Sequence, residues 1–131
     1  MKKLLILLAF ITTSLFAEVT NIYPDTAFLS KKVPIVDIRT QGEWKETGLL
    51  KGAIPITFFD ERGSYNIPLF LKELSAKVDV KKPFALVCRS GSRTKIVSTF
   101  LSQKLGYTVY DLNGGMLYVM GKNLPIVPYK K

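Results

Sequence analysis

The sequence predicts an α/β fold with a small central, mostly parallel sheet of about five strands and helices on both of its faces. Short apolar runs alternate along the chain with segments of helical periodicity, which is typical of parallel strands joined by helical crossovers. The run at 84–87 is apolar throughout, and the run at 34–38 ends in charge, as expected for buried parallel strands. No internal repeat, low-complexity stretch or linker interrupts the alternation, so we expect a single domain.

The first half of the chain predicts three strands and two short helices. Residues 19–22 form a short first strand, and Pro24-Asp25 opens a helix to about residue 30, because proline is favoured at an early helical position. The strand at 34–38 is followed by one helical turn at 40–46. The proline within the short strand at 53–56 predicts a position at an end or edge of the sheet, since proline cannot donate to a central ladder.

The second half predicts two longer helices on either side of the most apolar strand. Residues 66–77 carry apolar side chains near i, i+4 spacing, with Asn66 as the N-cap. The strand at 84–87 is expected at the centre of the sheet. Residues 94–105 form an amphipathic helix that ends at Gly106, because glycine suits the left-handed turn after a helix. The remaining expected elements are a strand at 108–110, a turn at 113–115 and a short helix to about residue 122.

The first residues have the three parts of a secretory signal peptide. Lys2 and Lys3 form a basic start, residues 4–11 are apolar, and Ala17 is a small residue suited to signal peptidase. We therefore expect a signal peptide at 1–17 and a single domain at 18–131, which would be periplasmic or secreted. The alternative is an uncleaved N-terminal anchor, and only in that case would the protein contact a membrane.

The charge balance favours anionic partners. The full chain has a formal net charge of +9, which falls to +7 without Lys2 and Lys3. A basic surface attracts anions of any kind, including small oxyanions. Export argues against nucleic acid as the partner, as does the scatter of the lysines in pairs rather than on one helical face. The lysine pairs themselves are best explained as a solvated basic surface.

The chain contains a single cysteine, Cys88, and no histidine. An internal disulfide, a zinc site of cysteine and histidine, and a Ser-His-Asp or Cys-His catalytic arrangement are therefore excluded. We expect no metal and no cofactor. If Cys88 is a nucleophile, its thiol must be activated by backbone dipoles and arginines.

The residues after Cys88 are suited to binding an anion beside a reactive thiol. A strand leads into the loop and a helix leads out of it, so backbone N–H groups and the positive end of that helix face the sulfur. Glycine permits the backbone angle such a loop needs, the serines add hydroxyl donors, and the arginines add positive charge. The alternative is a buried, inert cysteine. The predicted site consists of Cys88, Arg89, Ser90, Gly91, Ser92 and Arg93.

Four motifs, in this order and spacing, resemble a single-domain rhodanese over about residues 19–127. They are Ile35-Val36-Asp37-Ile38-Arg39-Thr40 followed by Glu43 and Trp44, the segment 48–55, the loop 88–93, and Gly114-Gly115 followed by Leu124-Pro125. The resemblance implies that Cys88 takes a sulfane sulfur from thiosulfate or a polysulfide as a persulfide and passes it to cyanide, a thiol or a partner protein. It also implies that the amides of 89–93 cradle the persulfide and that Arg93, with Arg89, orients the anion. Asp37 and Arg39 are expected to brace the loop and the sheet edge.

Two alternatives share this loop. Cysteine phosphatases place five residues between cysteine and arginine, whereas four separate Cys88 from Arg93 here, and the shorter loop favours sulfur transfer. A persulfide carrier with little turnover on small molecules would use the same loop. We expect the mouth around Arg89, Tyr65 and Met116 to distinguish the two, open and basic for an enzyme or apolar for a carrier. The chain departs from the rhodanese pattern at Leu49, where that family commonly has histidine.

Overall fold

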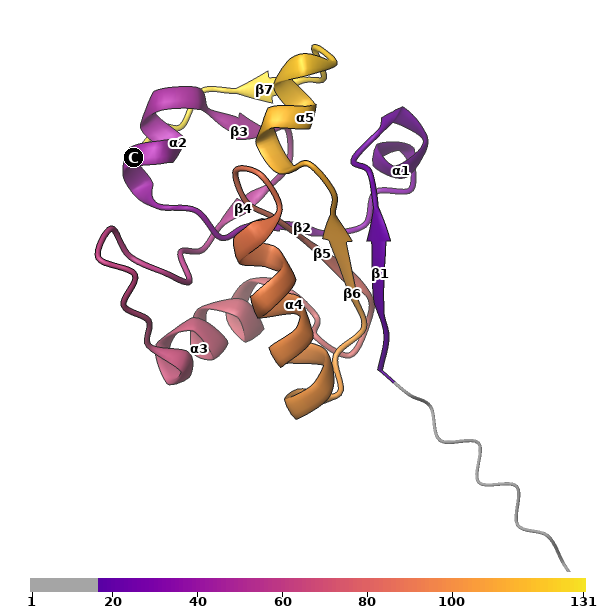
Figure 1. Cartoon of the computed structure of the whole chain (residues 1–131), viewed down its shortest axis with the longest axis vertical. Helices are drawn as coiled ribbons and strands as arrows, with labels where there is room; N and C mark the ends of the chain where they lie inside the picture. The colour runs from indigo at the N-terminus through magenta and orange to yellow at the C-terminus, as the bar shows by residue number, and fades with distance from the viewer. Residues whose placement is uncertain (1–16) are drawn as a thin grey trace, which may run out of the picture.

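The computed structural model describes residues 17–131, so the predicted signal peptide lies outside the described residues except for Ala17. A parallel sheet of five strands forms the centre of this part, and the predicted fold class is confirmed (Figure 1). The order across the sheet is β1-β6-β5-β2-β4. The strands are β1 (Val19–Ile22), β2 (Ile35–Asp37), β4 (Ile54–Pro55), β5 (Phe84–Val87) and β6 (Val109–Leu112). Pro55 lies in an edge strand, as expected.

The central strand β5 supplies both hydrophobic cores. Phe84 and Leu86 pack into the core on one face of the sheet, and Ala85 and Val87 pack into the core on the other. All four side chains are fully buried, which explains why this run contains no polar residue. The strand ends at Val87, so the next residue, Cys88, lies at the carboxyl edge of the sheet.

Helices cover both faces. On one face are α3 (Ile67–Lys77) and α4 (Ser92–Leu105), whose apolar sides share a core with Leu86. On the other are α1 (Thr26–Ser30) and α5 (Gly115–Gly121), which pack around Ala85 and Val87. The remaining helix, α2 (Gln41–Thr47), follows β2 beyond its carboxyl end, as Figure 1 shows.

Two helices begin elsewhere than predicted. The first helix has Asp25 as its N-cap, with the carboxylate accepting from the Phe28 N–H at 2.8 Å, so Pro24 lies before the helix rather than within it. The helix α4 begins at Ser92, earlier than the predicted residue 94, because Gly91 adopts φ 104° as its N-cap and turns the chain directly into the helix. Ser92 and Arg93 therefore belong to the first turn of α4 rather than to the loop.

A second, two-stranded sheet was not predicted. The strands β3 (Leu49–Leu50) and β7 (Ile126–Val127) pair antiparallel, and strands of two residues leave no periodic signal in the sequence. Gly48 precedes this pair at φ 78°, where a Cβ would lie 2.6 Å from the Val127 carbonyl oxygen. Leu49 is buried in the sheet, so the leucine that replaces the histidine of the rhodanese pattern has a packing role. Within residues 17–131, no helix is both long and apolar enough to cross a bilayer.

Candidate active site

Cys88 lies at the base of the loop between β5 and α4, with its side chain fully buried. The Gly91 backbone N–H donates a hydrogen bond to Sγ over 3.1 Å. The hydroxyl oxygen of Thr94 lies 3.6 Å from the same sulfur. Because Thr94 is in the first turn of α4, the positive end of that helix also faces Sγ. The Gly91 N–H and the helix N-terminus favour a negatively charged sulfur.

The start of α5 holds the loop in place from the other side. The backbone N–H groups of Met116 and Leu117 donate to the carbonyl oxygens of Cys88 and Arg89, at 2.9 and 3.0 Å. This approach requires glycine at 115, since a Cβ there would lie 2.5 Å from each of those two oxygens. The double glycine singled out in the sequence therefore allows a helix end to pack directly against the cysteine loop.

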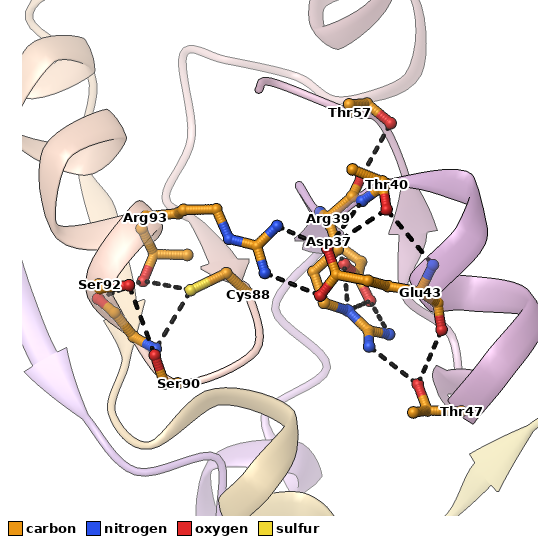
Figure 2. Close-up of polar contacts among 12 residues, drawn as sticks. Asp37, Arg39, Thr40, Glu43, Thr47, Thr57, Cys88, Ser90, Ser92 and Arg93 are labelled. Carbon is orange, nitrogen blue, oxygen red and sulfur yellow. Dashed lines mark hydrogen bonds and ion pairs between the residues drawn. The ribbon is translucent and has the colours of Figure 1, made fainter. Parts of the chain in front are cut away.

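Arg93 is paired with Glu43 of α2. Its two terminal nitrogens donate to the two carboxylate oxygens at 2.7 and 2.8 Å, and Figure 2 shows the side chain passing beside Cys88 to reach this carboxylate. These hydrogen bonds lower the pKa of Glu43 and raise the pKa of Arg93. The sequence analysis expected Arg93 to fold over the loop and orient an anion. In the structure this guanidinium already has a carboxylate partner.

The Glu43–Arg93 pair predicts a pH-dependent contribution to stability. The pKa of Glu43 is lower in the folded protein than its ordinary value of 4.5, so the contribution is complete above that value and is lost as the pH falls through the folded pKa. We expect Glu43→Gln to lower the free energy of unfolding by about 1 kcal/mol at neutral pH, because the pair is partly exposed to solvent. Urea denaturation at neutral pH and below about pH 3 measures this. If Glu43→Gln lowers the free energy of unfolding by the same amount in acid, the stabilisation does not come from the charged Glu43–Arg93 pair.

Asp37 and Arg39 form a buried ion pair at the end of β2. The Arg39 side chain is 1% exposed, and it donates to Asp37 through Nε and through one terminal nitrogen at 2.8 Å. The other donors of the guanidinium reach Thr47 at 2.8 Å and the Gly48 carbonyl at 2.9 Å. The pair therefore ties β2 to α2, the helix that carries Glu43 (Figure 2).

Several predicted site residues lie differently from expectation. The Ser90 and Ser92 hydroxyls are exposed and lie 3.4 Å from each other, and neither is bonded to Sγ. The Met116 side chain is fully buried in the core and does not form the mouth. Tyr65 is exposed but lines a separate cleft of about 640 Å³ between α2 and α3. Arg89 is exposed and borders a smaller cavity of about 190 Å³ together with Glu43 and Glu46.

Sequence reasoning missed two residues, namely Thr94, which contacts the sulfur, and Asp111, which contacts Thr94. The Thr94 hydroxyl donates to the Asp111 carboxylate at 2.6 Å, and both side chains are buried. Burial raises the pKa of Asp111, and the Thr94 hydrogen bond and the charge of Lys95 oppose this effect. A signal for Asp111 was present: it is a carboxylate between apolar residues in a strand next to the central one. Thr94 gave the weaker signal of a hydroxyl in the first turn of the helix after the loop.

The inert alternative required a buried Cys88, and the structure does bury it. The groups around the sulfur are nevertheless polar: a backbone N–H, a hydroxyl and a helix N-terminus. Cys88 also belongs to the hydrophobic core cluster that contains Leu86 and Val97, so it has apolar as well as polar neighbours. The polar contacts of the sulfur, and not its burial, are what distinguish it from an inert core cysteine. Within residues 17–131, no group of three or more Cys, Asp or Glu side chains is placed to hold a metal ion.

Comparison with known proteins identifies the family. The model of the rhodanese-like domain matches residues 26–121, whereas no curated protein matches the chain. A rhodanese-related protein from Thermoplasma volcanium shares 23% identity, covering 86% of this chain and 100% of that chain with a TM-score of 0.61. A rhodanese-like domain protein from Staphylococcus aureus shares 22% identity over 84% of this chain and 98% of that chain, with a TM-score of 0.57.

A further similar structure comes from Rhodopseudomonas palustris. It is a protein of unknown function, described as a possible tyrosine phosphatase, with 24% identity over 82% of this chain and 83% of that chain and a TM-score of 0.54. At these identities the solved structures support the fold alone. The family match spans most of the chain and contains the cysteine loop and both glycines of the α5 turn. The chain belongs to the family of rhodanese-like domains, which includes sulfurtransferases.

Proposed function

We propose that this protein is a sulfurtransferase that moves a sulfane sulfur from thiosulfate or a polysulfide to a thiophilic acceptor through a persulfide on Cys88. The observation that carries the proposal is the position of Sγ, which accepts the Gly91 N–H at 3.1 Å beside the N-terminus of α4. A thiolate is the attacking form of cysteine, and this environment stabilises it. In line with the signal peptide expected from the sequence, we propose that the reaction takes place in the periplasm or outside the cell.

The reaction needs no cofactor in either half. The Cys88 thiolate attacks the outer sulfur of thiosulfate, a sulfur–sulfur bond forms to Sγ, and sulfite leaves with the electron pair of the broken bond. In the second half, cyanide or a thiolate attacks the outer sulfur of the persulfide, and Cys88 leaves as a thiolate. The Gly91 N–H that donates to Sγ, together with the N-terminus of α4, can stabilise the terminal sulfur of the persulfide.

The size of the loop supports sulfur rather than phosphate as the bound group. Four residues separate Cys88 from Arg93, and α5 packs against the loop through Gly115. A single terminal sulfur needs less room than a tetrahedral phosphoryl group. Arg89 is exposed, and no ion pair of Arg89 is found within residues 17–131. Its guanidinium could therefore attract an anionic donor without first breaking an ion pair within the protein.

The test is the formation of thiocyanate by the purified protein from thiosulfate and cyanide. We expect a rate that is proportional to protein concentration, saturates with thiosulfate and follows ping-pong kinetics, because the persulfide separates two half-reactions. A rate no higher than that of the protein-free mixture, under all donor concentrations and with polysulfide as the donor as well, would contradict the enzyme proposal.

A persulfide carrier is the second candidate, and one surface favours it. Tyr65 is 60% exposed and Leu69 51% exposed, and both line the cleft of about 640 Å³ beside α2. The cleft also contains Phe58 and the charged side chains of Asp60, Glu73 and Lys77, so its lining combines apolar surface with charges of both signs. A carrier would take up one sulfur per chain from the donor but show little turnover with cyanide.

A further inference from the structure

Three buried side chains form a continuous chain of polar contacts from Cys88 to β6. The Cys88 sulfur lies 3.6 Å from Thr94 Oγ1, and this oxygen lies 2.6 Å from Asp111 Oδ1. Cys88 and Thr94 are fully buried and Asp111 is 4% exposed. The residues come from three elements that meet at the carboxyl edge of the sheet: the end of β5, the first turn of α4, and β6 beside β5. We call this set the Cys88–Thr94–Asp111 chain.

The number of protons in the Cys88–Thr94–Asp111 chain determines which group donates each hydrogen bond and which accepts it. A threonine hydroxyl has one proton to donate. The 2.6 Å contact has the length of a hydrogen bond from a hydroxyl to a carboxylate, so that proton points to Asp111. The Gly91 carbonyl, at 3.1 Å, is a longer competing acceptor. Because its proton points to Asp111, the Thr94 oxygen can accept a hydrogen bond from the Cys88 thiol.

We propose that Cys88 and Asp111 share one proton through Thr94, so that Asp111 is the internal proton acceptor of the thiol. The thiol proton moves from Sγ to Thr94 Oγ1 while the hydroxyl proton of Thr94 moves to Asp111 Oδ1. The products are a thiolate that accepts a hydrogen bond from Thr94, and a neutral carboxylic acid that donates one to it. No atom enters or leaves and the total charge is unchanged. Asp111 does not touch the reacting sulfur and is a positioning residue that acts through Thr94.

The surroundings of Asp111 favour this transfer. Burial raises its pKa, and the opposing charged group is Lys95 of α4. The neighbouring strands β1 and β5 contain no titratable side chain, and the other cations of α4 are Arg93, which is paired with Glu43, and Lys104 near its far end. A thiolate and a carboxylate in one buried chain repel each other, so we expect a single negative charge to be shared between them at neutral pH.

This proposal differs from an expectation drawn from the sequence. Without histidine, activation of the thiol was expected to come only from backbone dipoles and arginines. The structure adds a carboxylate that reaches the sulfur through one hydroxyl. The inference rests on the proposed use of Cys88 as a nucleophile, but it concerns the ionisation of the thiol, so its test needs no sulfur donor. A failure of sulfur transfer and a failure of proton sharing can therefore be told apart.

The experiment measures the ionisation of Cys88 and of Asp111 as a function of pH in the full protein. The ultraviolet absorbance of the thiolate, measured as the difference from Cys88→Ser, reports Cys88, and the carboxyl-carbon NMR resonance reports Asp111. For a shared proton each curve contains the same two midpoints, separated by about one pH unit or more. In Asp111→Asn the thiolate curve should reduce to one midpoint, and in Cys88→Ser the Asp111 curve should do the same.

Two further variants test the role of the hydroxyl. Thr94→Val removes the connection and should leave the thiolate curve with one midpoint, whereas Thr94→Ser should restore two. Asp79→Asn, in the turn before β5, is the matched control and should leave two midpoints, because its carboxylate bonds only the local Lys81 N–H. An unchanged thiolate curve in folded Asp111→Asn would overturn the proposal. If that variant does not fold, an Asp111 curve that is identical in the unmodified protein and in Cys88→Ser would overturn it equally.

Discussion

Replacing Cys88 by serine is expected to reduce thiocyanate formation from thiosulfate and cyanide to the rate of the protein-free mixture, a loss of at least about three orders of magnitude. Serine is close to cysteine in size and can accept the Gly91 N–H that now reaches Sγ. The loop should therefore keep its shape. A serine oxygen cannot take up a sulfane sulfur as a persulfide, so both half-reactions stop. The measurement is the initial rate of thiocyanate formation, with circular dichroism to establish that the variant is folded.

The matched control is Ser75→Ala in α3. Ser75 is exposed, and its hydroxyl bonds only a carbonyl of its own helix, so this variant should retain the rate of the unmodified protein within about twofold. A folded Cys88→Ser variant with a rate near that of the control would remove Cys88 from the mechanism. The phosphatase alternative makes a different prediction for the same pair of variants, namely Cys88-dependent hydrolysis of an aryl phosphate without thiocyanate formation.

Replacing Asp37 by asparagine is expected to lower the free energy of unfolding by about 3–5 kcal/mol, because it leaves the buried guanidinium of Arg39 without its counter-charge. Both side chains are almost entirely excluded from solvent. A loss of this size is a large part of the stability of a domain this small, which is typically about 5–15 kcal/mol. Urea denaturation with the same slope in both proteins measures it.

A second substitution separates the charge from the packing. Adding Arg39→Met to Asp37→Asn removes the unpaired charge, so the double variant should regain part of the lost stability. Full recovery is not expected, since Arg39 also donates to Thr47 and to the Gly48 carbonyl. If Asp37→Asn costs no more than the exposed control Asp79→Asn, the pair is not a structural brace of this edge of the sheet.

The parts of the fold that were predictable have strong local signals. The uninterrupted apolar run of β5 indicated a central strand, and Asn66 marked the start of α3. The strands β3 and β7 were not predictable, because a two-residue strand depends on a partner about 75 residues away rather than on its own pattern. The early start of α4 depends on the left-handed conformation of Gly91, which the sequence permits but does not require.

The site was predictable where the chain itself brings residues together. Cys88 and Gly91 are three residues apart, and their N–H to sulfur contact follows from the curl of one loop. Contacts with residues of other helices and strands could not be predicted from the sequence of the loop. Arg93 pairs with Glu43 across 50 positions, and Thr94 meets Asp111 across 17, and both contacts depend on how α2, α4 and β6 pack. The direction in which a side chain points at a shared sheet edge is determined by tertiary packing.

The most direct test of the account is the intact mass of the purified protein after treatment with thiosulfate and removal of the excess. We predict a gain of one sulfur atom on Cys88, reversed by cyanide with release of thiocyanate and absent in Cys88→Ser. The result is the same for an enzyme and for a carrier, since both hold the sulfur as a persulfide. A mass that stays unchanged with both thiosulfate and polysulfide, while the protein is folded and its cysteine reduced, would contradict sulfur transfer in either form.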